Sequence, residues 1–360
     1  MLQIAICGEG PIAQSIAAVC GWRGHRIRVW ARQPRCWRDW MDVTLPDGSS
    51  FLGPLDTVTA NPRVAVVGAD IIFICVPHRA ISPILQALEP HVDPGTLVGA
   101  VPGFGGFGLA ARRAMPRVVC FFGTQRIPFV VCSYVPGRAV TIGGIRRQTF
   151  VGTMPADSAW PVAELLRDVL GVRTVPVSHF LNVELSPSNS IVNPARLYAL
   201  FGPVAKKAPR RKEEFFLDWN RSASKLLLGL DDELQAGRRF IPRDTSFVAP
   251  ILLQYDANDA KTLTKRFRKL HGLANRLVPL RRVNGRSALD LSSDYVTEDI
   301  DHGLVLMRDI LRLGGASTPL MDEIIEWRFQ LNQRKAFSQG VDHQLLQPFK
   351  TIESLSSALD

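Results

Sequence analysis

The sequence predicts an α/β fold, with a doubly wound parallel sheet in the first half of the chain and an all-helical domain in the second. Three observations support this prediction. Short apolar runs alternate with helical patterns in the first half, a glycine-rich turn follows the first apolar run, and the sequence becomes mostly helical from residue 183 onward. We therefore expect two domains, residues 1–182 and residues 183–360.

Strands and helices alternate in the first half, which is the pattern of βαβ units. Two later apolar segments, Ala139–Ile142 and Val172–Val177, are expected to extend the same sheet, with a helix over Trp160–Leu170 between them. The earlier strands are expected at Leu2–Cys7, Arg26–Trp30, Ile71–Val76, Leu97–Val101 and Val118–Phe122, and the first helices at Ile12–Cys20 and Ala80–Leu88.

The second half carries helical periodicity over most of its length. A basic run at residues 206–212 is typical of an exposed loop between two of these helices. The helices are expected at Pro194–Phe201, Trp219–Gln235, Ala260–Leu270, Asp301–Leu313 and Pro319–Leu331.

Composition and charge narrow the class of protein. The chain of 360 residues is 46% hydrophobic and 21% charged, a normal globular balance. No apolar run is long enough to cross a bilayer, and the N-terminus lacks a signal peptide, so we expect a cytoplasmic protein without membrane contact. The net charge of +10 favours anionic cofactors and carboxylate substrates. Nucleic acid is not expected as a partner, because no nucleic-acid motif accompanies the charge.

All six cysteines lie in the first 132 residues, and none forms a CxxC pair. Most of them stand inside apolar runs. We therefore expect buried free thiols, with neither disulfides nor a metal site.

The turn after the first strand fits the GxGxxG/A pattern of dinucleotide-binding sites. The first glycine permits a tight turn, the second lets a pyrophosphate approach the backbone, and the third small residue allows close packing of helix on strand. A helix that begins here offers its N–H groups and its dipole to the phosphates. The position after a strand and before a helix supports a Rossmann-type domain. The cofactor-binding residues expected here are Gly8, Gly10, Pro11, Ile12 and Ala13.

The segment after the second strand selects the dinucleotide. NAD-binding chains place an acid there, whereas this chain has Arg32, Arg35 and Arg38. Arginine suits a 2′-phosphate through its charge and its planar donors, so the sequence predicts NADP(H). Pro77 and Pro102, which end later strands, are expected to line the nicotinamide side.

Longer motifs extend through most of the chain, and the most specific are Thr297–Ile300 and Thr318–Asp322. In these segments the chain resembles the opine dehydrogenase family (octopine/nopaline dehydrogenase type), most closely the staphylopine and pseudopaline dehydrogenases, which make metallophores. The other matching segments are Gly8–Ala13, Pro102-Gly103, Gly123–Pro128, Ser186–Tyr198, Asp218-Trp219 and Leu230–Glu233.

The resemblance implies a reaction and its site. Family members condense an amine with an α-keto acid and reduce the resulting imine with NAD(P)H. For this chain it implies an amino-acid-type amine, pyruvate or 2-oxoglutarate, metallophore biosynthesis, and a homodimer formed through the helical domain. It places Asp299 and Asn193 in the catalytic site, and we expect Arg196, Asn189 and Tyr295 to contact the substrate.

Two positions depart from the family pattern. Asn193 stands where the family has the histidine presumed to be the acid/base, and Asp294 stands where it has an arginine. An asparagine amide cannot shuttle a proton, and losing a general acid/base costs about 10²–10⁴-fold in rate. Two carboxylates close together, at Asp294 and Asp299, should raise one pKa. The identity of the proton donor therefore stays open, and His179 and His302 are candidates. For both histidines, the plainer interpretation is a surface or interdomain residue.

Plainer interpretations also exist for the two catalytic candidates. Asn193 is alternatively the cap of a helix opened by Pro194, and Asp299 the N-cap of a helix that begins near Ile300.

Three other functions stay open at this point. The chain is alternatively a catalytically silent NADP-binding relative that acts as a sensor or partner subunit. It is alternatively a reductase resembling ketopantoate reductase or glycerol-3-phosphate dehydrogenase, which requires a catalytic lysine such as Lys206, Lys207 or Lys225. A nucleic-acid binder is the weakest alternative.

Overall fold

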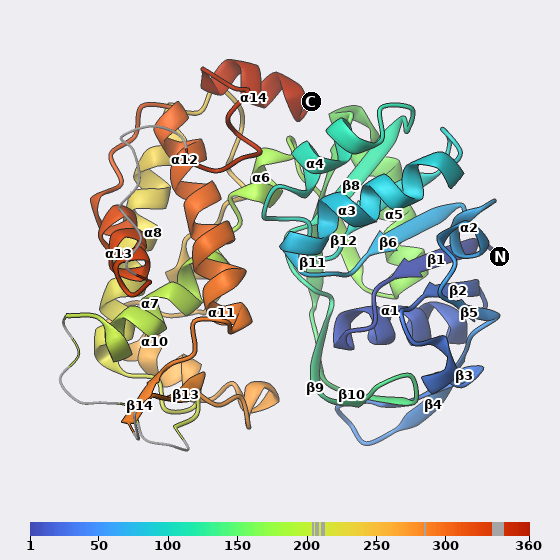
Figure 1. The fold of residues 1–360 in the computed structure, drawn as a ribbon, viewed down its shortest axis with the longest axis horizontal. Coiled ribbons are helices and arrows are strands. Elements are labelled where there is room, and N and C mark those ends of the chain that lie inside the picture. Colours follow the sequence, from blue (N-terminus) through green and yellow to red (C-terminus); the bar gives the residue numbers. More distant parts are fainter. Residues whose placement is uncertain (204, 206–208, 210–212, 284–285, 333–341) are drawn as a thin grey trace. The chain divides into compact units, whose positions relative to one another are not determined.

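The computed structural model describes residues 1–203, 205, 209, 213–283, 286–332 and 342–360. The basic run at 206–212, with Lys206 and Lys207, thus lies almost wholly outside the described residues. The described chain forms two compact units (Figure 1). The first comprises Met1–Glu184 together with Ala358–Asp360, and the second comprises Leu185–Ser357. A Rossmann-like unit followed by a helical unit confirms the predicted fold class.

The first unit is built on an eight-stranded sheet of order β12-β11-β8-β7-β6-β1-β2-β5. All neighbouring pairs are parallel except β11 and β8, so the sheet is mixed rather than purely parallel. Its strands are β1 (Gln3–Cys7), β2 (Arg26–Trp30), β5 (Thr57–Thr59), β6 (Ile71–Ile74), β7 (Leu97–Ala100), β8 (Cys120–Thr124), β11 (Gln148–Met154) and β12 (Arg173–Pro176).

A second sheet of four strands, which the sequence pattern does not predict, packs on helix α1 (Pro11–Trp22). Its β10 (Ala139–Ile145) contains the segment expected to extend the main sheet, so that expectation is wrong. Helix α1 is rich in small apolar residues and is buried on all sides from Ala13 to Gly21. A Cβ at Gly21 would lie 2.2 Å from the Pro54 carbonyl oxygen. The other strands of this sheet are β3 (Trp40–Thr44), β4 (Ser50–Pro54) and β9 (Phe129–Val135).

The remaining helices of the first unit connect the strands of the main sheet, except α6, which follows the last strand. Helices α1 and α5 contact each other, whereas α2, α3 and α4 form a second contacting group. Their bounds are α2 (Pro62–Val66), α3 (His78–Leu88), α4 (Phe107–Ala114), α5 (Ala159–Leu170) and α6 (Leu181–Glu184).

The second unit is mainly helical, but a short hairpin of β13 (Leu280–Val283) and β14 (Arg286–Leu289) makes "all-helical" too strict. Helix α7 begins at Asn189, five residues before the expected start at Pro194. The helix expected at Asp301–Leu313 is a π-helical turn, η6 (Asp299–Leu304), followed by α12 (Val305–Leu313). The other helices are α7 (Asn189–Phe201), α8 (Arg221–Gly237), α9 (Ile251–Gln254), α10 (Ala260–Phe267), α11 (Asp294–Thr297), α13 (Pro319–Gln330) and α14 (Ile352–Ala358).

The six cysteines are free thiols, and Cys7, Cys20 and Cys75 are buried as expected. Cys36, in the 3₁₀ turn Pro34–Cys36, and Cys132, on the edge strand β9 of the small sheet, are exposed. Among the described residues, no group of three or more His, Cys, Asp or Glu side chains could hold a metal ion. No helix in the described ranges has both the length and the apolar character needed to cross a membrane.

Candidate functional site

The turn after β1 has the backbone geometry that the glycine motif predicts. Gly8 has φ +141°, and its N–H donates to the Trp30 carbonyl at the end of β2, at 3.3 Å. A Cβ at Gly8 would lie 2.4 Å from the Cys75 carbonyl oxygen. A backbone atom cannot rotate away, so only glycine fits this position.

Gly10 and Ala13 complete the turn in different ways. A Cβ on Gly10 would meet none of the described atoms within 4 Å, so open space adjoins this backbone. Gly10 is also the N-cap of α1, where no side-chain cap is found among the described residues, and Pro11 is the first helical residue. Ala13 is fully buried. An open backbone at an uncapped helix N-terminus fits the phosphates of a dinucleotide.

Glu9 reaches from this turn to the segment after β2. Its Oε2 lies 2.7 Å from Arg32 Nε, and its Oε1 accepts the Gln33 N–H at 3.0 Å. Burial raises the pKa of Glu9, but the Arg32 guanidinium and the Gln33 N–H outweigh burial and lower it. Arg35 lies in a short 3₁₀ turn that follows. The glycine motif gives no signal for Glu9, because this residue occupies a variable position of the motif.

Pro77 and Pro102 lie beyond the ends of β6 and β7, as expected for residues at this edge of a parallel sheet. Pro77 is the N-cap of α3, whose first residue, His78, packs against Phe104 with ring centroids 5.5 Å apart. A Cβ on Gly105 would lie 2.5 Å from the His78 ring, so this loop and α3 are closely packed.

Glu184, at the end of α6, holds the same glycine-rich loop. Its carboxylate accepts the N–H of Gly106 at 2.7 Å and of Gly108 at 3.3 Å, at the start of α4. Burial raises the pKa of Glu184 to about 7, against the backbone hydrogen bonds that lower it. No local motif marks this residue, because its partners are about 77 residues away in the sequence.

In the second unit, the structure brings Asn193 and Asp299 together. Asn193 Nδ2 donates to Asp299 Oδ2 at 2.7 Å. The side chains are 1% and 7% exposed, so the pair is shielded from water. Asn193 Oδ1 is buried and accepts no hydrogen bond within the described ranges. The amide therefore presents an unpaired acceptor beside a carboxyl group.

Burial raises the pKa of Asp299 to about 7. The carboxylates of Glu298 and Asp294 add to this effect, whereas the Asn193 N–H lowers the pKa. The raised pKa agrees with the prediction for neighbouring carboxylates, although burial is the larger cause. Near neutral pH the group can hold or release a proton.

Neither residue is a helix cap, so the two capping interpretations are wrong. Asn193 lies inside α7, because buried Ile191 and Val192 draw the preceding turn into the helix. Asp299 is the first residue of η6, and its side chain bonds to Asn193 rather than to a backbone N–H. π-helical turns are frequent at functional sites.

Gly303 explains why η6 approaches α7 so closely. A Cβ at this position would lie 2.4 Å from Ser190 Oγ and 3.2 Å from the Glu298 carbonyl oxygen. The absence of a side chain at Gly303 thus lets α7 and η6 pack together, and this packing supports the Asn193–Asp299 contact.

The expected substrate-contacting residues have different environments. Arg196 is fully buried, and its guanidinium bonds to Glu213 at 2.7 Å and to the carbonyls of Phe215 and Asp218. Tyr295 stacks on Phe215 with ring centroids 4.2 Å apart. Asn189 is exposed at the start of α7. The geometry gives Arg196 a packing role between α7 and the segment at 213–218.

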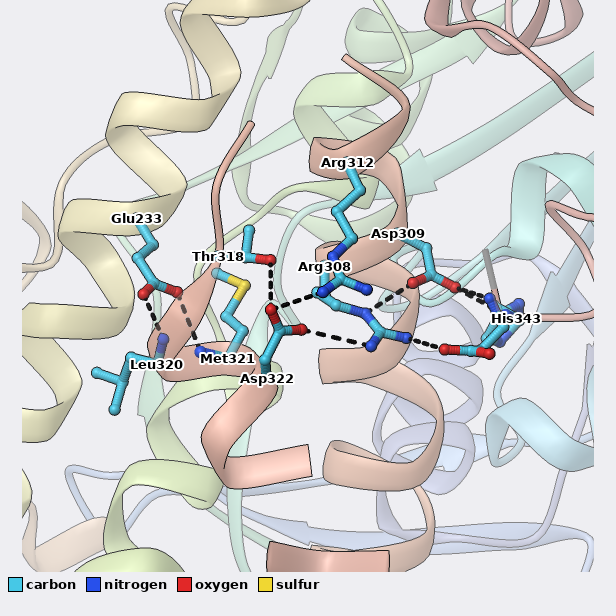
Figure 2. Close-up of polar contacts among 10 residues, drawn as sticks. Glu233, Arg308, Asp309, Arg312, Thr318, Leu320, Met321, Asp322 and His343 are labelled. Atoms are coloured by element: carbon cyan, nitrogen blue, oxygen red, sulfur yellow. Dashed lines mark hydrogen bonds and ion pairs between the residues drawn. The ribbon is translucent and has the colours of Figure 1, made fainter. Parts of the chain in front are cut away.

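A buried network accounts for the Thr318–Asp322 motif (Figure 2). Pro319 opens α13, and Asp322 reaches back to α12, where it contacts Arg308 Nη1 at 3.4 Å and Arg312 Nη2 at 2.6 Å. Glu233 of α8 accepts the N–H groups of Leu320 and Met321. The motif therefore joins three helices.

Arg308 is the centre of this network, as Figure 2 shows. Its side chain is 3% exposed and contacts Asp309 at 2.7 Å and Asp342 at 2.8 Å, besides Asp322. Asp309 in turn accepts the N–H groups of Asp342 and His343. The segment that begins at residue 342 is thereby held against α12.

Neither candidate histidine is a surface residue without contacts. His179 is 3% exposed, its Nδ1 accepts the Leu181 N–H, and its Nε2 lies 3.1 Å from an Asp360 oxygen. His302 Nδ1 lies 3.2 Å from His343 Nε2. Both histidines thus have structural partners within their own unit.

Comparisons with known proteins agree with this arrangement. Residues 176–332 match the model of the NAD/NADP octopine/nopaline dehydrogenase α-helical domain. Residues 3–114 match the N-terminus of NAD-dependent glycerol-3-phosphate dehydrogenase. Both candidate catalytic residues lie inside the first match, and the glycine turn lies inside the second.

Relatives extend over most of the chain. The uncharacterized protein y4xO of Sinorhizobium fredii is 29% identical over 311 residues, which cover 80% of this chain and 82% of that protein. An opine dehydrogenase of Haliotis discus hannai is 24% identical, and the match covers 91% of this chain and 89% of that protein.

Solved structures share the fold over the whole chain. Octopine dehydrogenase, solved with NADH and L-arginine, matches 100% of this chain and 99% of its own, with a TM-score of 0.84 and 20% identity. Yersinopine dehydrogenase with bound NADP⁺ matches 100% of this chain and 98% of its own, with a TM-score of 0.67 and 14% identity.

Proposed function

We propose that the chain, as a member of the opine dehydrogenase family, catalyses the NADPH-dependent reductive condensation of an amino-acid-type amine with an α-keto acid. The observation that carries the proposal is the buried Asn193–Asp299 pair, in which Asp299 has a pKa of about 7. Such a carboxyl group can give and take a proton at neutral pH, which is what the loss of the usual histidine requires.

We propose that Asp299 is the proton donor. In its neutral form, Oδ2 accepts the Asn193 N–H, so the proton resides on Oδ1. The amine attacks the keto carbon and forms a carbinolamine. Oδ1–H then protonates the carbinolamine hydroxyl, which leaves as water, and a protonated imine forms. The imine nitrogen keeps its proton when hydride arrives at the carbon, and the Asp299 carboxylate regains a proton from solvent before the next turnover.

Asn193 contributes orientation rather than proton transfer. Its Nδ2 is committed to Asp299, which fixes the amide so that Oδ1 is the remaining acceptor. An N–H of the amine or of the protonated imine is the natural partner for that oxygen, because an unpaired buried acceptor costs about 1–3 kcal/mol. Asn189 and Tyr295 are proposed to contact the substrate. Arg196 is proposed to hold α7 against the segment at 213–218.

The glycine turn is proposed to hold a nicotinamide dinucleotide, which supplies hydride to the imine carbon when bound. Gly8, Gly10 and the start of α1 receive the phosphates. Arg32 and Arg35 favour NADPH, because each can face a 2′-phosphate. Related structures contain NADH in octopine dehydrogenase and NADP⁺ in yersinopine dehydrogenase, so both forms are worth testing.

Further parts of the proposal rest on the family resemblance. We propose pyruvate or 2-oxoglutarate as the keto acid, a role in metallophore biosynthesis, and a cytoplasmic homodimer formed through the helical unit. The partners are small molecules rather than nucleic acid or membranes. Light scattering of the purified protein tests the dimer.

Asn193 and Asp294 favour one alternative, a catalytically impaired relative that binds NADP as a sensor or partner subunit. Asn193 cannot move a proton, and Asp294 reverses a family charge. In that case the raised pKa of Asp299 has no catalytic use. A reductase that uses a lysine is less well supported, since Lys225 is exposed on α8 and the helical unit matches the octopine/nopaline type.

The decisive experiment is NADPH oxidation by the purified protein. Pyruvate and 2-oxoglutarate are each supplied with L-arginine, agmatine, other amino acids and an aminobutyrate-extended histidine. Asp299→Ala serves as the test variant, and Asp232→Ala, an exposed carboxylate on α8, is the matched control.

The outcomes separate the two functions. Turnover that Asp299→Ala abolishes and Asp232→Ala retains supports an opine-type reductase. Tight NADPH binding without turnover, with activity restored by Asn193→His together with Asp294→Arg, establishes the impaired relative. Turnover that survives Asp299→Ala contradicts the proposed donor.

A further inference from the structure

The Glu9 side chain lies at a position that the glycine motif does not predict. It stands between the two glycines of the turn, yet its carboxylate reaches the segment after β2, where it contacts Arg32 Nε and the Gln33 N–H. The Gly8 N–H bond to the Trp30 carbonyl joins the two segments. The structure thus supplies, from the first loop, an acid that the second strand lacks.

This place is where the fold distinguishes the two dinucleotides. In doubly wound sheets, an acid after the second strand binds the ribose 2′-hydroxyl of NAD, and an arginine accommodates the 2′-phosphate of NADP. Here a carboxylate and an arginine lie 2.7 Å apart at that position, with side-chain exposures of 22% and 92%. Glu9 is the more constrained partner, because its carboxylate accepts two hydrogen bonds, whereas the Arg32 side chain is exposed to solvent.

We infer that the Glu9–Arg32 pair sets the cofactor preference of this chain and that Glu9 acts against the 2′-phosphate, so that NADH is accepted alongside NADPH. Glu9 does so in two ways. It neutralises the arginine that would otherwise bind the phosphate, and its own charge repels a second anion. Its remaining lone pairs can accept a ribose hydroxyl. The inference rests on the proposed function, since it requires that the glycine turn binds a nicotinamide dinucleotide.

Charge removal at Glu9 separates this role from a merely structural one. Glu9→Gln keeps the shape and can still accept the Gln33 N–H, but it releases Arg32 and removes the negative charge. A structural role for Glu9 predicts equal weakening of both dinucleotides. The proposed role predicts opposite changes, tighter NADPH and weaker NADH.

The experiment measures the dissociation constants of NADH and NADPH for the full chain by fluorescence titration, without any substrate. The variants are Glu9→Gln, Arg32→Gln and the double variant. Glu164→Gln, which removes a carboxylate from the Arg167 pair on α5, is the matched control. Circular dichroism and thermal unfolding check that each variant is folded.

We expect Glu9→Gln to shift the ratio of the two constants about tenfold toward NADPH, and Arg32→Gln to shift it about tenfold toward NADH. In the double-mutant cycle, the two changes should be coupled for NADPH and nearly additive for NADH. Glu164→Gln should leave the ratio unchanged.

Other results overturn the inference in distinguishable ways. If both dinucleotides bind but Glu9→Gln leaves the ratio unchanged or moves it toward NADH, the role of Glu9 is wrong and the proposed function stands. If neither dinucleotide binds the wild-type chain, the cofactor part of the proposed function fails and the inference fails with it. A folded Arg32→Gln with an unchanged ratio excludes the pair even if Glu9→Gln is unstable.

Discussion

The glycine turn of the first unit and the polar pairs of the second unit are built in opposite ways. The turn offers backbone N–H groups and empty space beside Gly10. The second unit holds buried polar side chains, namely the Asn193–Asp299 pair and the network around Arg308. Backbone sites are limited by steric room, whereas buried charged sites are limited by the cost of desolvating each charge.

Removing Arg308 should break the second kind of site most severely. In Arg308→Ala, the carboxylates of Asp309, Asp322 and Asp342 lose a common partner while Asp309 stays fully buried. An unpaired buried charge costs about 3–5 kcal/mol, and we expect this loss in the free energy of unfolding. Urea denaturation measures it.

Arg312→Ala is the matched control for that loss. Arg312 contacts Asp322 alone among the same carboxylates and is 26% exposed, so its removal should cost about 1 kcal/mol or less. Equal losses for the two variants would contradict a buried network centred on Arg308.

Asp299→Asn tests the other buried pair through its pH dependence. The neutral carboxyl is the proposed acid, so the wild-type rate should be high below pH 7 and fall as the pH rises through the pKa of about 7. The variant should lose about 10²–10³-fold in kcat, and its rate should no longer fall as the pH rises through 7. Initial rates across pH, with Asp232→Asn as the control, measure both. If the rate of the variant still fell as the pH rose through 7, another group would be the proton donor.

The same substitution should change stability in a defined direction. The folded pKa of Asp299 is raised above its unfolded value, so its contribution to stability is full at acidic pH and is lost as the pH rises toward and through 7. Asp299→Asn removes this loss, and its thermal midpoint should depend less on pH than that of the wild type. A parallel pH dependence in both proteins would contradict the raised pKa.

Gly8→Ala and Gly10→Ala sharpen the contrast within the turn itself. Gly8→Ala forces a Cβ against the Cys75 carbonyl at a positive φ, so it should destabilise the first unit by about 2–3 kcal/mol. Gly10→Ala meets open space and should change the free energy of unfolding by less than about 1 kcal/mol while weakening dinucleotide binding. If Gly10→Ala left binding unchanged, the open space would not be the phosphate site.

Gly303→Ala tests the packing that supports the Asn193–Asp299 contact. The added methyl group displaces Ser190 Oγ, which can rotate, although the nearby Glu298 carbonyl limits the movement of η6. We expect about 1–2 kcal/mol of destabilisation and a pH limb moved upward, because a longer Asn193–Asp299 distance weakens the bond that lowers the pKa of Asp299. Thermal unfolding and the pH–rate profile measure the two effects. The double variant that combines Ser190→Ala with Gly303→Ala removes the clashing hydroxyl and should restore part of the lost stability.

Local patterns were sufficient for part of the site. The glycine motif predicted the turn after β1, and the apolar runs predicted β2 at its observed bounds. The start of α7 was misplaced, because Pro194 is a common first residue of helices and its tolerance inside this one depends on packing. The second sheet was missed, because its strands are separated in the sequence by about 100 residues and one of them resembles a strand of the main sheet.

The sequence by itself determined the fold class, the glycine turn and the residue types at Asn193 and Asp299. It did so because steric rules and hydrophobic periodicity act over a few residues. Only the tertiary structure decided that Asn193 donates a hydrogen bond to Asp299, that burial raises the pKa of Asp299, and that Glu9 pairs with Arg32. Burial and charge pairing depend on segments far apart in the sequence, so no local pattern specifies them.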